Sequence, residues 1–346
     1  MPSAVLSKKN LVTLLKVGTA VVILYVLFRR IQAESGFERL INEPKQWPYL
    51  IAAQIMVLMA FSLSYVRWFL LVRGLDLQFR LSDAFRLGTL GFMLNQISPG
   101  SVGGDLLKAV FIAREQPGKR TEAVATVFVD RIIGLYGMLL IASVGLALAG
   151  DSIDSVELRT TLRSVVWTSA IFGTLGLAFV LSPLATSKPL REFAKALPIV
   201  GATATKLIEA ADVYRSRRSY LFAGFAIALL THGLLITAFW SISQGLPVTR
   251  PTFLQNASLV PVCLVAGAVI PTPGGLGGME GSFEFLYSSI GSVKGDGTIV
   301  AIAYRSMTYL FAAIGAFYYF TSRRNVDQLL HEAEHLGEEP SDDPGT

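Results

Sequence analysis

The stretch 95-NQISPGSVGGD-105 interrupts an apolar region that runs from Ala84 to Ala113. Its proline and glycines divide that region into two arms, Phe85–Ser98 and Leu106–Ala113. At about 1.5 Å per residue, neither arm crosses a hydrocarbon core of about 30 Å. We therefore predict a re-entrant hairpin, which enters a membrane and returns to the side from which it came.

A second interruption, 273-PGGLGGME-280, lies in the apolar region Thr252–Ser289 and predicts a second hairpin. The first arm of this hairpin looks longer than its counterpart and could cross a membrane. Around the two hairpins, six uninterrupted apolar segments are each long enough for a spanning helix. These segments are Leu11–Phe28, Tyr49–Val72, Val124–Ala149, Val165–Leu184, Tyr220–Ile242 and Thr298–Phe320.

Composition supports an all-α polytopic membrane protein. Of the 346 residues, 52% are hydrophobic and only 16% are charged, whereas soluble proteins carry about 25% charged residues. This excludes a disordered chain and a typical soluble enzyme. The single cysteine excludes an internal disulfide, and three histidines offer little for a metal centre. We expect no metal, no cofactor and no catalytic residue.

Basic residues gather in the loops between apolar runs, so the net charge of +5 indicates membrane topology rather than nucleic-acid binding. Basic loops face the cytoplasm by the positive-inside rule. We therefore predict one transmembrane domain, residues 1–324, in the cytoplasmic membrane, with both termini inside. We expect residues 325–346 to form an acidic, disordered tail on the cytoplasmic side. The loop 29–45 fits poorly, because it carries four basic residues and lies outside in this topology.

An internal repeat relates the two hairpins. Each glycine motif ends in an acid, Asp105 or Glu280, and an arginine, Arg131 or Arg305, follows each motif proline by 32 residues. The repeats cover about residues 49–149 and 220–320. In the predicted topology they have opposite polarity, and inverted repeats with broken helices are typical of transporters.

The acids and arginines predict two pairs, Asp105 with Arg131 and Glu280 with Arg305. A charge at membrane depth faces either a partner or a cavity, so each pair is either a structural salt bridge or part of a phosphate site. Glycine N–H groups at a helix start attract anions, although glycine also lets helices pack closely. The candidate substrate-binding residues are Asn95, Gly103, Gly104, Asp105, Arg131, Gly277, Gly278, Glu280 and Arg305.

Other polar residues receive weaker assignments. Asp130 lies about 100° round the helix from Arg131 and should face elsewhere. We expect Glu284 to extend the acidic face of Glu280, and His232 to be a packed hydrogen-bonding residue. The tail contains His331 and His335 in the zinc-protease pattern H-E-x-x-H. Without sequence to build a cleft, this motif does not predict a metal site.

The motif 95-NQISPGSVGGD-105, the later run 129-VDRIIGL-135 and the motif 273-PGGLGGMEG-281 resemble the lysylphosphatidylglycerol synthase transmembrane family. The resemblance covers roughly Leu11 to Phe320. It implies a flippase-like membrane protein, similar to the membrane domain of bacterial multiple peptide resistance factors. That domain is implicated in moving aminoacylated phospholipid between leaflets, and it precedes a soluble transferase domain. Only a short tail follows Phe320 here, so we expect no lipid aminoacylation.

Two functions remain open from the sequence. The first is a flippase or transporter of a phospholipid or lipid-linked glycan, whose head-group phosphate binds at the paired hairpin tips. The alternative is an accessory or enzyme-like membrane subunit in polyprenyl-phosphate sugar or lipid modification, which would need a separate transferase partner. The expected binding partner is a membrane lipid or a lipid-linked substrate, not a nucleic acid.

Overall fold

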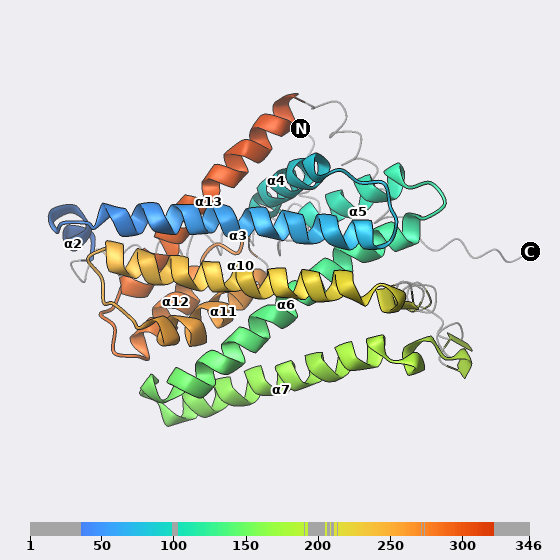
Figure 1. Ribbon diagram of the computed structural model, residues 1–346. Coiled ribbons are helices and arrows are strands. Elements are labelled where there is room, and N and C mark those ends of the chain that lie inside the picture. The colour runs from blue at the N-terminus through green and yellow to red at the C-terminus, as the bar shows by residue number, and fades with distance from the viewer. Residues whose placement is uncertain are drawn as a thin grey trace, which may run out of the picture.

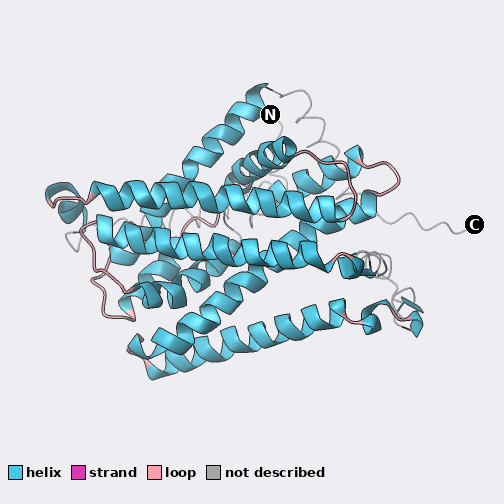
Figure 2. Cartoon of the chain, viewed as in Figure 1, coloured by secondary structure: helices cyan, strands magenta, loops and turns pink. Residues whose placement is uncertain are grey.

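The computed structural model describes residues 36–98, 103–189, 191–192, 205, 208, 211–212, 214–270, 272 and 274–321. Within these ranges every regular element is a helix (Figures 1 and 2). The α-helices are α2 (Gly36–Asn42), α3 (Trp47–Gly74), α4 (Leu81–Ile97), α5 (Gly103–Glu115), α6 (Arg120–Ala149), α7 (Val156–Leu181), α10 (Arg218–Gly245), α11 (Phe253–Val269), α12 (Gly278–Ser288) and α13 (Asp296–Thr321). Two short 3₁₀ turns, η1 (Gly150–Ser152) and η2 (Pro183–Thr186), flank α7.

Five of these helices, α3, α6, α7, α10 and α13, are long and apolar enough to cross a membrane. They correspond to five of the six predicted spans, which confirms an all-α polytopic membrane protein. The sixth predicted span, Leu11–Phe28, lies outside the described residues, as does the tail with its two histidines.

Helix α7 begins nine residues earlier than predicted, at Val156 instead of Val165. The Oγ atom of Ser155 caps its first turn by accepting a hydrogen bond from the Leu158 N–H. Arg159 and Arg163 lie on successive turns of this helix, and both pair with Asp151. The polar segment after α6 is therefore mostly helix instead of the predicted loop.

The helices form two units with the same order, α3 to α6 and α10 to α13. Helices α3 and α10 have 28 residues each, and α4 and α11 have 17 each. The expectation that the second hairpin has the longer first arm was therefore wrong. The error lies in hairpin 1, because its first arm was predicted to begin at Phe85 whereas α4 begins at Leu81; the start of α11 next to Thr252, which caps it, agrees with the prediction.

Helices α3 and α10 lie side by side and run in opposite directions (Figure 1). At one end, the Gln46 N–H donates to the Gly245 carbonyl over 2.9 Å. At the other end, the Tyr214 hydroxyl donates to the Leu71 carbonyl over 3.0 Å, and burial raises the pKa of this hydroxyl above its ordinary value. The two units therefore have opposite polarity.

The two helical hairpins open at opposite ends of the bundle. Hairpin 1 is α4 with α5, and its ends are joined by a 2.6 Å bond from the Gln116 side chain to the Gln78 carbonyl. Hairpin 2 is α11 with α12, and at its ends the Val293 N–H donates to Thr249 Oγ1 over 3.2 Å. Each hairpin returns to the end at which it began. That both re-enter a membrane in this way stays a prediction.

Charge differs between the two ends. At the end where hairpin 1 opens, the stretches 73–86, 114–122 and 212–218 contain nine Lys or Arg residues and five acids among the described residues. At the other end, the stretches 38–45, 150–163, 246–252 and 289–296 contain six of each. We call the first the basic end. By the positive-inside rule it is the end expected in the cytoplasm.

Candidate functional site

The two hairpins meet inside the bundle. The arms of hairpin 1 touch backbone to backbone, because a Cβ added to Gly104 would lie 2.1 Å from the Gly91 carbonyl oxygen. The turn of hairpin 2 reaches the end of α4, because a Cβ on Gly274 would lie 3.1 Å from the Gln96 carbonyl oxygen. The predicted site residues, which are far apart in sequence, thus gather at one junction.

In hairpin 2 the predicted pair forms and is buried. The Nε atom of Arg305 donates to Glu280 Oε1 over 2.5 Å. The side chain of Glu280 is 1% exposed and that of Arg305 is 9% exposed. Little of this guanidinium is left open to an incoming ligand.

The remaining groups of this pair hold the turn of hairpin 2. Arg305 donates from its two terminal nitrogens to the carbonyls of Gly274 and Gly275, over 2.8 and 3.4 Å. The other oxygen of Glu280 accepts the Gly277 N–H over 2.8 Å. All three glycines have positive φ, between 59° and 81°, a conformation that a side chain would disfavour. The pair therefore fastens a turn that only glycine forms readily.

In hairpin 1 the predicted pair also forms, but it is more open. The Nε atom of Arg131 donates to a carboxylate oxygen of Asp105. The side chain of Arg131 is 42% exposed and that of Asp105 is 21% exposed. Lys108, one turn along α5, places its Nζ atom 3.9 Å from the other oxygen of Asp105 and 5.2 Å from the ring centroid of Trp68. One carboxylate thus lies between two cations.

The N–H groups at the start of α5 donate within the protein. Asn95 Oδ1 accepts the Gly104 N–H over 2.7 Å, and Ser98 Oγ accepts the Gly103 N–H over 3.1 Å. Asn95 is therefore a helix cap in this structure. It fixes α5 against the end of α4 and so positions Asp105.

A second, buried pair lies behind the first. Asp130 faces away from the Asp105 pair, as its helical position predicts, and accepts a 2.7 Å bond from Arg67 Nε. Both side chains are at most 12% exposed. Arg67 packs against Gly134, whose carbonyl contacts His232 Nε2 at 2.9 Å. Among the described residues, the charged cluster around Asp105 and Asp130 thus contains three cations, Arg67, Lys108 and Arg131, and these two acids.

Arg67 and Lys108 were not predicted as residues of the site. Arg67 was included in an apparently uninterrupted span, although an arginine inside such a span is itself a signal of a partner. Lys108 was read as part of a short apolar arm. Its spacing of three residues from Asp105 was the available signal, because residues three apart share a helix face.

Glu284 does not extend the acidic face, and this prediction was wrong. Its carboxylate accepts the Gly295 N–H over 2.6 Å and both the N–H and the hydroxyl of Thr298 over 3.2 and 3.0 Å. It therefore caps the start of α13, where the exposed N–H groups of a helix favour a carboxylate.

These helices define a polytopic membrane protein with two hairpin units of opposite polarity and a charged junction between them. The family model of the lysylphosphatidylglycerol synthase TM region matches residues 13–316, and the chain belongs to this family. It is also similar to a UPF0104 membrane protein of Pyrococcus horikoshii. The two are 26% identical over 285 residues, which cover 75% of this chain and 83% of the relative.

Proposed function

We propose that this protein moves a phospholipid or a lipid-linked glycan between the leaflets of the cytoplasmic membrane, with the head-group phosphate held by Arg131. The observation that carries the proposal is the 42% exposure of the Arg131 side chain beside the tip of hairpin 1. A planar guanidinium is suited to two-pronged binding of phosphate. Membership of a family named for a lipid-synthase membrane region ties the protein to lipid handling.

The charge balance of the cluster around Asp105 and Asp130 agrees with an anionic head group. Three cations face two acids, so the cluster has one positive charge in excess. One phosphodiester carries one negative charge and would neutralise it. Lys108 supplies a second donor next to Arg131, because both contact the same carboxylate.

In this proposal Asp105 occupies the anion position when no lipid is bound. An arriving phosphate takes the place of the carboxylate at Arg131 and Lys108, and the carboxylate returns when the lipid leaves. Hairpin 2 has a different task. Its turn is fastened by Arg305 and forms a fixed wall of the junction. The membrane re-entry of both hairpins and the cytoplasmic termini belong to the same proposal.

The test is movement of labelled phosphatidylglycerol in proteoliposomes that contain only this protein. Arg131→Gln should lower the rate at least about tenfold, because a hydrogen bond to a charged group contributes about 1.5–3 kcal/mol. Arg120→Gln is the matched control, since Arg120 is exposed at the start of the same helix. It should transport at close to the normal rate.

Both variants must be monodisperse before transport is compared. A folded Arg131→Gln protein with a normal rate would refute the phosphate site. A folded wild-type protein that moves no lipid of any head group would instead favour the partner-dependent role in polyprenyl-phosphate sugar chemistry.

A further inference from the structure

A cavity of about 770 Å³ opens at the basic end, between the arms of hairpin 1. Three arginines lie along it: Arg73 at the end of α3, Arg80 before α4 and Arg86 in the second turn of α4. Its wall includes the side chains of Leu90, Leu107 and Phe111. The cavity therefore combines a cationic rim with an apolar wall.

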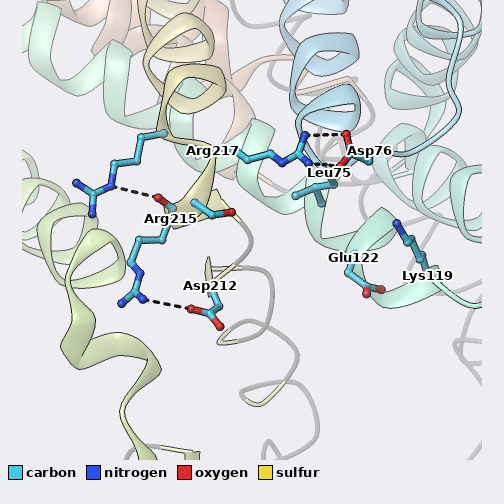
Figure 3. Close-up of a pocket in the computed structure, with 9 residues that line it drawn as sticks. Leu75, Asp76, Lys119, Glu122, Asp212, Arg215 and Arg217 are labelled. Atoms are coloured by element: carbon cyan, nitrogen blue, oxygen red, sulfur yellow. Dashed lines mark hydrogen bonds and ion pairs between the residues drawn. The ribbon is translucent and has the colours of Figure 1, made fainter.

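A second cavity at the same end provides a contrast (Figure 3). There Arg217 binds Asp76 with both terminal nitrogens, and Arg215 lies 3.6 Å from Asp212. Carboxylates of the protein already occupy the positions that an anion would take. This second cavity is therefore a poor candidate for a ligand site.

The arginines of the hairpin cavity are not neutralised in this way. Among the residues that the structure describes, no carboxylate pairs with the side chain of Arg73, Arg80 or Arg86. Asp83 lines the same cavity, but its carboxylate accepts the backbone N–H of Arg80. With Glu115, the lining still carries one net positive charge.

The wall adds a second property. Leu90 and Leu107 are each 1% exposed and belong to the packed core behind the wall, whereas Phe111 packs on them, is only partly buried and presents apolar surface to the cavity. A free inorganic anion gains nothing from this exposed part of Phe111, whereas an acyl chain that covers it does, because burial of apolar surface is favourable. Anionic lipids of the inner leaflet attract basic residues at the membrane surface.

We propose that this cavity binds an anionic phospholipid, with its phosphate at Arg73, Arg80 and Arg86 and an acyl chain against Phe111. The site is distinct from Arg131. It lies on the mouth side of hairpin 1, while Arg131 pairs with Asp105 beside the tip. A lipid held there is bound to the hairpin without taking the place of Asp105.

The test measures binding of dioctanoyl phosphatidylglycerol to the purified full chain by native mass spectrometry. All proteins carry Arg131→Gln, so that the proposed transport site does not contribute. The variant is R73Q/R80Q/R86Q. The matched control is K119Q/R120Q/R218Q, which removes the same charge at the same end but from residues that do not line this cavity.

We expect the cavity variant to bind the lipid at least about tenfold more weakly, because each basic residue near an anionic lipid contributes to binding. The control should change binding by less than about threefold, because solvent and salt screen more distant charges. Dioctanoyl phosphatidylcholine and inorganic phosphate should both bind more weakly than the anionic lipid.

Three results would overturn the proposal. Equal losses in the cavity variant and the control would mean general surface attraction. Phosphate that binds as tightly as the lipid would mean a site for free anions. Phosphatidylcholine that binds equally well would mean that the arginines do not select the head group. Since no transport is measured, failure of the transport proposal leaves these outcomes unchanged.

Discussion

The two repeats place different chemistry on equivalent positions. Alignment of Gly74 with Gly245, Asp105 with Glu280 and Arg131 with Arg305 defines the equivalences. The equivalent pairs are Arg67 and Ala238, Trp68 and Phe239, Lys108 and Phe283, and Asp130 and Tyr304. Three charged residues of the first repeat are thus replaced by an alanine and two aromatic residues in the second.

The aromatic residues of the second repeat form a compact stack. The ring centroids of Phe239 and Phe283 lie 4.7 Å apart, and those of Phe239 and Tyr304 lie 4.4 Å apart. Such contacts add stability beyond the burial of apolar area. In the first repeat the same location holds Lys108 over Trp68 and the Arg67–Asp130 pair.

The difference shows how one scaffold divides two tasks. Both repeats keep an acid and an arginine at the hairpin, and in the second the arginine also binds the carbonyls of Gly274 and Gly275. The second pair is a brace within an apolar surrounding. The first pair lies in a charged, partly exposed surrounding, and in the proposed function it exchanges its partner for a phosphate. The equivalent positions of the two acids and of the two arginines in the sequence therefore do not imply equal roles.

The largest expected effect is the loss of the brace. Arg305→Met leaves the buried Glu280 carboxylate without its cation and removes two bonds to the hairpin turn. Removal of one partner of a buried pair costs about 3–5 kcal/mol. Arg131→Met should cost no more than about 1 kcal/mol, because exposed pairs contribute little.

Both losses of stability are measured as unfolding midpoints in detergent, with the fraction of folded protein after heating determined by size-exclusion chromatography. Arg305→Lys should lie between wild type and Arg305→Met, because lysine restores the charge but not the fork of donors. Equal midpoint shifts for Arg305→Met and Arg131→Met would contradict the proposed difference between the repeats.

A smaller effect is expected at the buried pair of the first repeat. Arg67→Met should destabilise the protein by about 3 kcal/mol, the lower end of the range for buried pairs, since Asp130 is still 12% exposed. The double variant Arg67→Met/Asp130→Leu should recover most of this loss, because well-packed apolar residues often replace a buried pair without cost.

A double-mutant cycle on the unfolding midpoints measures this recovery. If the double variant is as unstable as the sum of the two single variants, the two side chains are not coupled and the assignment of this pair fails. Recovery would also show that the first repeat tolerates the apolar character of the second.

Much of the fold followed from the sequence, because its main signals are local. Length and hydropathy predicted the spanning helices, and two Gly-Pro turns predicted the hairpins. Opposite polarity followed from counting spans and from the basic loops. The start of α7 was missed, because a polar first turn that is capped by Ser155 looks like a loop in a hydropathy profile.

The site was predicted less completely, because partner choice depends on packing. The repeat predicted both acid–arginine pairs from equal spacing, and the structure brings them together. It did not predict that Arg305 also binds Gly274 and Gly275, which requires the folded turn. Nor did spacing reveal that Arg67 lies beside Asp130, since these residues are 63 positions apart in the sequence and lie on different helices.

Gly104 in the first turn of α5 and Gly278 at the start of α12 are the second glycines of the two Gly-Gly pairs in the hairpin motifs. A Cβ at Gly104 would lie 2.1 Å from the backbone oxygen of Gly91, so Gly104→Ala must push the two arms of hairpin 1 apart. A Cβ at Gly278 would lie 2.7 Å from Cδ1 of Ile270, which can rotate away, and 2.9 Å from Cβ of Ile270, which is fixed to the backbone but is not as close as the Gly91 oxygen is to Gly104. Gly281 is the control, because nothing lies within 4 Å of its added Cβ.

Overpacking typically costs about 1–3 kcal/mol. We expect Gly104→Ala at the upper end of this range, Gly278→Ala at the lower end, and Gly281→Ala neutral or slightly stabilising, because alanine favours a helix by up to about 1 kcal/mol. Unfolding midpoints of the three proteins give the order. If Gly278→Ala were the most harmful, the tighter backbone contact would belong to hairpin 2, and hairpin 1 would have the freedom to move. With the expected order, α4 and α5 move as one body, and any exchange at Asp105 must come from side chains instead of from separation of the arms.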